Sequence, residues 1–262
     1  MSRRAAVLGS PIAHSRSPQL HLAAYRALGL DDWTYERIEC TAEDLPALVG
    51  GLGPEWVGLS VTMPGKFAAL RVADERTARA ELVGSANTLV RTEAGWRADN
   101  TDVDGVAGAL GPSTPVGVAA VLGAGGTAPA AVVALAELGA REVSVVARNR
   151  DKAAPLVDLA ARLGVDAHWV ELGSTIGGVD VVVSTLPAEV AGRYAETVVT
   201  APVLLDAIYD PWPTPLAMAF AAAGGRVVGG LQMLLNQAFA QVERFTGRPA
   251  PKEAMIAALG RT

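Results

Sequence analysis

Only three lysines occur in the chain, and one of them stands where a protein could use it for chemistry. Lys66 ends the turn 62–66, which directly follows the strand-like segment 56–61. Polar side chains at strand ends are favoured sites of chemistry in α/β proteins. A desolvated lysine can lose its proton near neutral pH, whereas arginine keeps it, so Lys66 is a candidate for proton transfer. Taken by itself, however, the segment is by default an ordinary turn with a surface lysine.

A glycine-rich turn follows a second apolar strand pattern, at 116–122, and precedes a helix pattern at 127–138. Glycines in such a turn permit close approach of the backbone to a pyrophosphate at the helix N-terminus. The last position departs from the usual glycine of the dinucleotide fingerprint, in a way that the fingerprint tolerates. The alternative is an ordinary strand-to-helix turn. The residues of the turn are Gly123, Ala124, Gly125, Gly126, Thr127 and Ala128.

The next expected strand, 142–147, indicates which dinucleotide would bind. An NAD site usually has Asp or Glu about 20 residues after the glycines, where it holds the ribose hydroxyls. Here the strand is followed by Arg148, Asn149 and Arg150, with no acid before Asp151. Because arginine can pair with a 2′-phosphate, the sequence favours NADP over NAD. Solvated arginines at a strand end remain the alternative.

The elements that must position these residues alternate between strand and helix patterns, which predicts mostly parallel sheets. We expect one helix at 17–28 with Ser17 as its N-cap, and another that Thr41 caps. A helix at 102–110 should link two α/β domains, 1–101 completed by 231–262, and 102–230, with a cleft between them. The remaining expected strands are 5–8, 33–38, 179–184, 203–207 and 226–228, and the closing helices are 231–245 and 252–259.

The composition excludes several classes of protein. The chain is 50% hydrophobic, 19% charged and has a net charge of −5, which argues against disorder and against nucleic acid as a partner. Its single cysteine, Cys40, excludes an internal disulfide and suits a reducing cytoplasm. The uncharged stretch 111–136 is rich in glycine and alanine and fits a buried strand, turn and helix, so we expect no membrane partner. The histidines have no metal-ligand spacing, so we expect no metal.

Four short motifs occur in order, each at an element boundary: 15–18 (SRSP), 61–66 (VTMPGK), 85–88 (SANT) and 99–102 (DNTD). With these motifs the chain resembles the shikimate dehydrogenase family. The resemblance also covers 123–126, Arg148, Tyr209 and 230–237, and therefore runs from about Val7 to the C-terminal helices. It implies an N-terminal α/β substrate domain and a Rossmann-like NADP-binding domain.

The resemblance further implies reversible, NADP-dependent reduction of 3-dehydroshikimate to shikimate, in aromatic amino acid biosynthesis. Lys66 and Asp102 match the catalytic pair; burial lowers and a carboxylate raises the pKa of a lysine, so the owner of the transferred proton stays open. Ser15 and Ser17 match the serines that hold the substrate carboxylate. The residues that match binders of the ring hydroxyls or neighbours of the nicotinamide are Thr62, Asn87, Gln237 and Tyr209. Each of these could also be a cap, turn, helix-face or packing residue.

The expected cofactor residues are the turn 123–128, Arg148, Asn149, Arg150, Thr185 and Gly230. The chain departs from the family at Ala128-Pro129 and at Ala147, so the expectation of NADP depends chiefly on Arg148 and Arg150. Asp99 and Asp104 have no matching role and are interpreted as turn or linker charges. A shikimate/quinate dehydrogenase that uses NAD, and a non-catalytic sensor, remain alternatives. We expect a monomer or homodimer.

Overall fold

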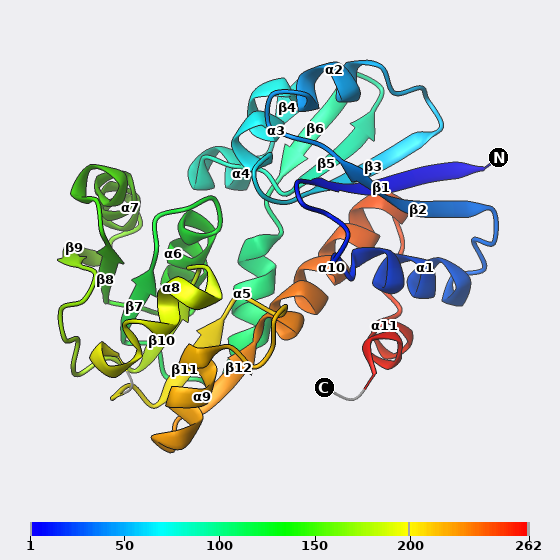
Figure 1. Cartoon of the computed structure of the whole chain (residues 1–262). Coiled ribbons are helices and arrows are strands. Elements are labelled where there is room, and N and C mark those ends of the chain that lie inside the picture. Colours follow the sequence, from blue (N-terminus) through cyan, green and yellow to red (C-terminus); the bar gives the residue numbers. More distant parts are fainter. Residues whose placement is uncertain (1, 199, 261–262) are drawn as a thin grey trace. The chain divides into compact units, whose positions relative to one another are not determined.

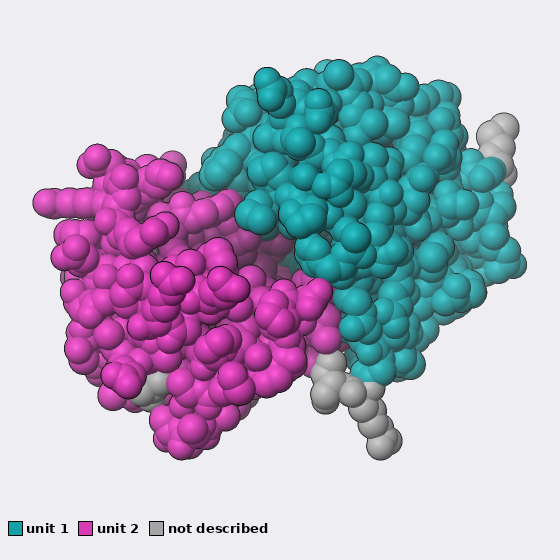
Figure 2. All heavy atoms as spheres, in the orientation of Figure 1, with its two compact units in different colours: residues 1–101, 237–262 teal, residues 102–236 magenta. Residues whose placement is uncertain are grey.

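The computed structural model describes residues 2–198 and 200–260 and divides the chain into two compact units. Unit 1 comprises Met1–Thr101 and Gln237–Thr262, and unit 2 comprises Asp102–Asn236 (Figure 2). Residues 231–236, which the sequence assigned to the first domain, therefore lie in unit 2. Within the described ranges, no helix is long and apolar enough to cross a membrane.

Unit 1 contains a six-stranded mixed sheet in the order β2-β1-β3-β5-β6-β4 (Figure 1). The predicted parallel arrangement holds for β2, β1 and β3, but β5 runs antiparallel to both β3 and β6. The short turn between β5 and β6 returns the chain as a hairpin, which makes these two strands antiparallel. The strands are β1 (Arg3–Gly9), β2 (Trp33–Glu39), β3 (Trp56–Val61), β4 (Glu75–Arg76), β5 (Thr88–Thr92) and β6 (Gly95–Asp99).

The two N-caps predicted for unit 1 are not the observed ones. The first helix begins at Ser17 as predicted, but its N-cap is Arg16, and the Ser17 N–H donates to Ser15 Oγ at 3.3 Å. Thr41 Oγ1 accepts from Asp44 N at 3.2 Å and so organises the turn that precedes the second helix. The helices are α1 (Ser17–Ala27), α2 (Leu45–Gly50), α3 (Lys66–Val72), α4 (Ala78–Val83) and α11 (Lys252–Leu259), together with most of α10 (Gly230–Thr246).

Unit 2 is a doubly wound domain around a parallel sheet in the order β12-β11-β10-β7-β8-β9. The order reverses between β7 and β10, which is where such sheets bind ligands. The strands are β7 (Val118–Leu122), β8 (Glu142–Ala147), β9 (Asp166–Glu171), β10 (Val181–Ser184), β11 (Val203–Asp206) and β12 (Arg226–Gly229). The helices are α5 (Asp102–Leu110), α6 (Ala128–Glu137), α7 (Arg150–Arg162), α8 (Ala188–Gly192) and α9 (Pro215–Ala222), with a 3-10 turn at Ala195–Thr197.

The core of unit 1 encloses a histidine. His21 is fully buried, its ring stacks on Tyr35 with centroids 4.0 Å apart, and its Nε2 lies 3.3 Å from Gln241 Oε1. Burial lowers the pKa of His21 to about 3, although the hydrogen bond with Gln241 opposes this shift. The ring is therefore neutral in the folded protein at pH 7.

This burial predicts a specific loss of stability in acid. Below about pH 6.5 the unfolded chain protonates His21, whereas the folded protein does so only near pH 3. The free energy of unfolding should therefore fall as pH decreases through this window, by up to about 1.4 kcal/mol per pH unit from this group. His21→Phe keeps an aromatic ring against Tyr35 and should flatten the dependence, as measured by urea unfolding at pH 7, 6 and 5. His14→Phe, at an exposed histidine, is the control, and an equal slope in both variants would contradict the prediction.

Candidate active site

All strands of the unit 2 sheet run in one direction, so their carboxyl ends meet at one edge. Gly123 follows β7, Arg148 follows β8, Thr185 follows β10 and Gly230 follows β12. Tyr209 comes shortly after β11 and is half-buried. The residues that the sequence predicted for the dinucleotide therefore come from the same edge of one sheet.

The backbone conformation and the close packing at the first position of the turn require a glycine. Gly123 has a φ of 106°, and a Cβ at this position would lie 2.6 Å from Thr185 Oγ1. The Thr185 side chain is held there because Oγ1 donates to Leu122 O at 2.9 Å. Gly123 thus allows β7 and the end of β10 to approach each other closely.

Gly125 differs, because a Cβ on this residue would meet no other atom within 4 Å. Its φ is ordinary as well, so neither packing nor backbone conformation explains a glycine here. The open space lies at the turn before α6, whose N-terminus carries the positive end of the helix dipole. Space for a ligand and a helix N-terminus together fit the diphosphate of a dinucleotide.

The residues after β8 have separate local roles, although all three are exposed. Asn149 Oδ1 caps α7 by accepting from Asp151 N at 2.8 Å and from Lys152 N at 3.2 Å. The Arg150 guanidinium lies over the Trp169 ring, 5.9 Å from its centroid. Asn149 therefore has a structural reason for its place, and Arg148 is the best candidate among the three for a charge-assisted contact with a phosphate.

Gly230 also has a structural reason for being glycine. A Cβ on this first residue of α10 would clash with the Ala207 carbonyl group, in the segment that follows β11. The Gly230 N–H donates to Ile208 O at 3.3 Å. Small size at this position keeps the start of α10 against the segment that leads to Tyr209.

In unit 1, Lys66 is the first residue of α3 and is only 9% exposed. Its carbonyl oxygen accepts from Ala86 N at 3.0 Å, which ties the turn of Lys66 to the segment that contains Asn87. Thr62 begins the same turn: its N–H donates to Leu8 O at 2.8 Å, and its carbonyl accepts from Gly65 N at 2.8 Å. The backbone around the lysine is therefore fixed by β1 and by the chain just before β5.

The two predicted carboxylate-binding serines lie at the start of α1, and both are buried. Arg37 of β2 donates to Ser15 O through Nε at 2.8 Å and Nη2 at 2.5 Å, which fixes the loop before the helix. The Ser17 hydroxyl is hydrogen-bonded to Tyr35. Burial raises the pKa of Tyr35, so its hydroxyl keeps its proton at neutral pH.

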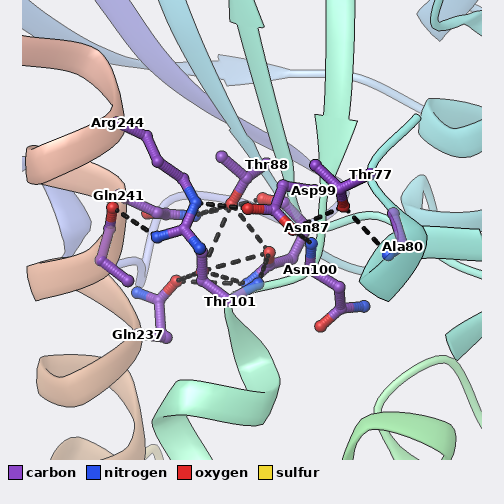
Figure 3. A network of polar contacts seen from close by, with 11 residues as sticks. Thr77, Ala80, Asn87, Thr88, Asp99, Asn100, Thr101, Gln237, Gln241 and Arg244 are labelled. Carbon is purple, nitrogen blue, oxygen red and sulfur yellow. Dashed lines mark hydrogen bonds and ion pairs between the residues drawn. The ribbon is translucent and has the colours of Figure 1, made fainter. Parts of the chain in front are cut away.

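Asn87 and Gln237 are 150 residues apart in sequence, and the structure brings them together (Figure 3). Asn87 Nδ2 lies 3.3 Å from Gln237 Oε1 and donates to Thr101 Oγ1 at 3.0 Å, while the Thr101 N–H donates to Asn87 Oδ1 at 2.7 Å. All three side chains are buried. They form a cluster of neutral donors and acceptors, which suits recognition of hydroxyl groups.

Asp99 is not the turn or linker charge that the sequence suggested. It ends β6, is buried, pairs with Arg244 of α10, and accepts from Thr77 Oγ1 and Asn100 N, each at 2.8 Å. Burial alone would raise its pKa, but the Arg244 charge and these hydrogen bonds lower the pKa overall, so the carboxylate stays ionised. It therefore links β6, α4 and α10.

A spacing in the sequence could have revealed these partners. Gln237, Gln241 and Arg244 stand at positions i, i+4 and i+7 of α10 and so lie on one helix face. Figure 3 shows all three directed toward the segment from Thr88 to Thr101. A polar stripe on a helix that is otherwise rich in buried apolar residues was the signal that sequence analysis missed.

Asp102 is the first residue of α5 and directly follows Thr101 in the chain. Its side chain is only 5% exposed. The bond from the Thr101 N–H to Asn87 therefore anchors the backbone one residue before this buried acid.

Among the residues that the structure describes, no group of three or more histidine, cysteine or acidic side chains could hold a metal ion.

Family models match both ends of the chain: the shikimate dehydrogenase substrate binding domain over residues 7–89, and the shikimate 5′-dehydrogenase C-terminal domain over residues 230–259. The shikimate dehydrogenase (NADP(+)) of Microcystis aeruginosa is 34% identical over 97% of this chain and 94% of its own. The crystal structure of Mycobacterium tuberculosis shikimate dehydrogenase is 71% identical, with a TM-score of 0.93 over 98% of each chain. That of the Thermus thermophilus enzyme in complex with shikimate is 31% identical, with a TM-score of 0.81 over 98% of this chain and 97% of its own. The resemblance inferred from the four motifs is confirmed, and the chain belongs to the shikimate dehydrogenase family.

Proposed function

We propose that the protein catalyses the reversible, NADP-dependent reduction of 3-dehydroshikimate to shikimate, a step in aromatic amino acid biosynthesis. The observation that carries the proposal is the buried contact between Asn87 and Gln237, next to the segment that holds Lys66. The names of the relatives agree with this activity. The enzyme would act on its small-molecule substrate in the cytoplasm, as a monomer or homodimer, and its one buried, free cysteine suits a reducing compartment.

For the cofactor, support comes from the carboxyl edge of the unit 2 sheet. NADPH, when bound, supplies the hydride for the reduction. The space at Gly125 and the N-terminus of α6 would receive its diphosphate, and Arg148 its 2′-phosphate. Gly123, Thr185 and Gly230 would shape this edge through the close contacts that they make within the chain.

For the substrate, support comes from the buried polar residues of unit 1. Ser15 and Ser17 would hold the carboxylate through their hydroxyls, beside the N-terminus of α1. Thr62, Asn87 and Gln237 would bind ring hydroxyls, and an analogue without those hydroxyls would leave buried amides unpaired. Tyr209, which follows β11 of unit 2, would lie next to the nicotinamide.

Lys66 and Asp102 would act as one acid–base unit. When the carbonyl group is reduced, its oxygen gains a proton, which a lysine ammonium can donate while a carboxylate orients the ammonium. Both side chains are buried, and a buried charge is costly unless it is paired. The transferred proton is assigned to the pair and not to either residue alone.

The catalytic assignment predicts the outcome of a simple assay. Lys66→Ala should reduce kcat for shikimate oxidation with NADP by about 100-fold or more, because it removes the group that moves the proton. The assay follows NADPH absorbance, and Lys152→Ala, at an exposed lysine of α7, is the control.

Other outcomes of the same assay would favour other functions. Unchanged turnover in Lys66→Ala would exclude the proposed mechanism. Efficient oxidation of quinate with NAD would indicate a shikimate/quinate dehydrogenase, and activity with neither polyol would favour a ligand sensor on the same fold.

The cofactor assignment predicts that Arg148→Ala raises the Michaelis constant for NADP by about 10-fold, because one charge-assisted hydrogen bond is lost. The Michaelis constant for NAD, which has no 2′-phosphate, should change by less than about two-fold. Arg162→Ala, at the exposed end of α7, should change neither value. Equal effects of Arg148→Ala on the two cofactors would rule out the contact with the 2′-phosphate.

The two glycines of the turn should respond differently to alanine. Gly123→Ala should lower the free energy of unfolding by about 1–3 kcal/mol, because the φ is positive and the Cβ would clash with Thr185. Gly125→Ala has space for its methyl group and should leave stability within about 0.5 kcal/mol of the wild type. It should nevertheless weaken NADP binding, as measured by the thermal shift that NADP produces. An undiminished shift in Gly125→Ala would contradict a diphosphate at this position.

A further inference from the structure

Gln241 is a buried amide that the proposed function does not use. It stands one turn after Gln237 on α10 and is 1% exposed. Its Nε2 donates to Asn87 O at 3.2 Å and to Thr88 Oγ1 at 2.9 Å. Its Oε1 accepts from Ser60 Oγ at 2.7 Å and lies 3.3 Å from His21 Nε2. These contacts use the full hydrogen-bonding capacity of the amide.

Backbone groups fix the direction of the hydrogen bonds around Asn87 (Figure 3). The Thr101 N–H can only donate, so the Asn87 atom that faces it at 2.7 Å must be the amide oxygen. The Asn87 carbonyl can only accept, so the Gln241 atom that faces it must be the amide nitrogen. The orientations of both amides therefore follow from their surroundings.

Thr88 connects these two amides. Its hydroxyl accepts from Gln241 Nε2 at 2.9 Å, and its single hydrogen is then directed to Asn87 Oδ1 at 2.8 Å. With its oxygen engaged by Thr88 and Thr101, Asn87 turns its nitrogen toward Gln237 Oε1. The Gln237 amide thus directs its oxygen to Asn87 and its nitrogen away from it.

The same direction continues upstream of Gln241. The Tyr35 hydroxyl donates to Ser60 Oγ at 2.6 Å, and Ser60 donates to Gln241 Oε1 at 2.7 Å. Since Tyr35 is also hydrogen-bonded to Ser17, one chain of hydrogen bonds runs from the start of α1 to Gln237. Reversing any amide along it would bring two donors or two acceptors face to face in a buried environment.

We propose that Gln241 is a positioning residue which, by directing the Thr88 hydroxyl to Asn87 Oδ1, reinforces the Thr101 N–H in holding the donor and acceptor pattern that Asn87 and Gln237 present to the substrate hydroxyls. The inference rests on the proposed role of Asn87 and Gln237 in binding shikimate. Gln241 itself does not touch the substrate. Together with the Thr101 N–H, it keeps the Gln237 amide nitrogen available as a donor, so that the site selects a hydroxyl oxygen as its acceptor.

The test combines two variants in a double-mutant cycle. Gln241→Met keeps the length of the side chain and removes its polar atoms, and Thr88→Val removes the connecting hydroxyl with little change in shape. Each should raise the Michaelis constant for shikimate by about 10-fold, because Asn87 Oδ1 then has only the Thr101 N–H to hold it in place and the amide is less firmly fixed. The Michaelis constant for NADP should stay within about two-fold of the wild type, since its proposed site is on unit 2.

The double variant gives the decisive result. If Gln241 acts through Thr88, the Michaelis constant of the double variant for shikimate should be no higher than that of the more affected single variant. The reason is that both substitutions break the same chain of hydrogen bonds. Thr246→Val is the matched control, since Thr246 lies on the same helix and its hydroxyl bonds only locally, to Val242 O at 2.7 Å and to the segment 246–248.

Several results would overturn the inference. If the two increases in the Michaelis constant for shikimate multiply in the double variant, the substitutions act independently, by separate structural damage. If each single variant has the same Michaelis constant as Thr246→Val, the chain of hydrogen bonds does not position the amides. If Gln241→Met does not fold, the comparison of Thr88→Val with Thr246→Val decides alone, again by the Michaelis constant for shikimate. Wild-type protein that does not oxidise shikimate with NADP would overturn the proposed function as well, whereas the other results would leave it intact.

Discussion

The hydrogen bond from the Thr101 N–H to Asn87 Oδ1 is the constraint on which the buried polar cluster of unit 1 depends. It closes the segment after β6 onto the segment before β5, and it fixes which way the Asn87 amide faces. The Gln237 amide is oriented by its contact with the Asn87 amide. Asp102 directly follows Thr101, so the same bond fixes the backbone just before it. One buried bond thus coordinates side chains from three separate parts of the chain. A buried donor and acceptor pair of this kind is costly to break, because each group would be left without water.

Unit 2 follows a different principle, in which position comes from the sheet itself. Its strands are apolar and parallel, and their carboxyl ends place Gly123, Arg148 and Thr185 along one edge. The specific features are local: one glycine with a positive φ, and another beside open space. The two units therefore position functional residues by different means, unit 1 through buried polar contacts and unit 2 through topology.

Sequence patterns located the elements whose cause is local. Strands Trp56–Val61 and Glu142–Ala147 and helices Asp102–Leu110 and Lys252–Leu259 have the bounds predicted, because apolar runs and periodicity specify them. The N-cap of α1 was mispredicted by one residue, because the cap is Arg16, whose side chain makes no capping hydrogen bond. The role of Asp99 was missed because its partner Arg244 is 145 residues away. Helix Arg150–Arg162 and strand Asp166–Glu171 were not predicted, although the helix has an amphipathic pattern. Long-range pairing, rather than propensity, decides such cases.

Helix α10 has a consequence for how the chain is made. Its first residues belong to unit 2 and its later ones to unit 1, so unit 2 is an insertion in the sequence of unit 1. A ribosome completes residues 102–236 before it reaches Gln241 and Arg244. Until then Ser60, Thr88 and Asp99 lack the helix that satisfies them. The half of the protein that begins first is therefore the half that is finished last, and its polar interior is completed only when α10 has emerged.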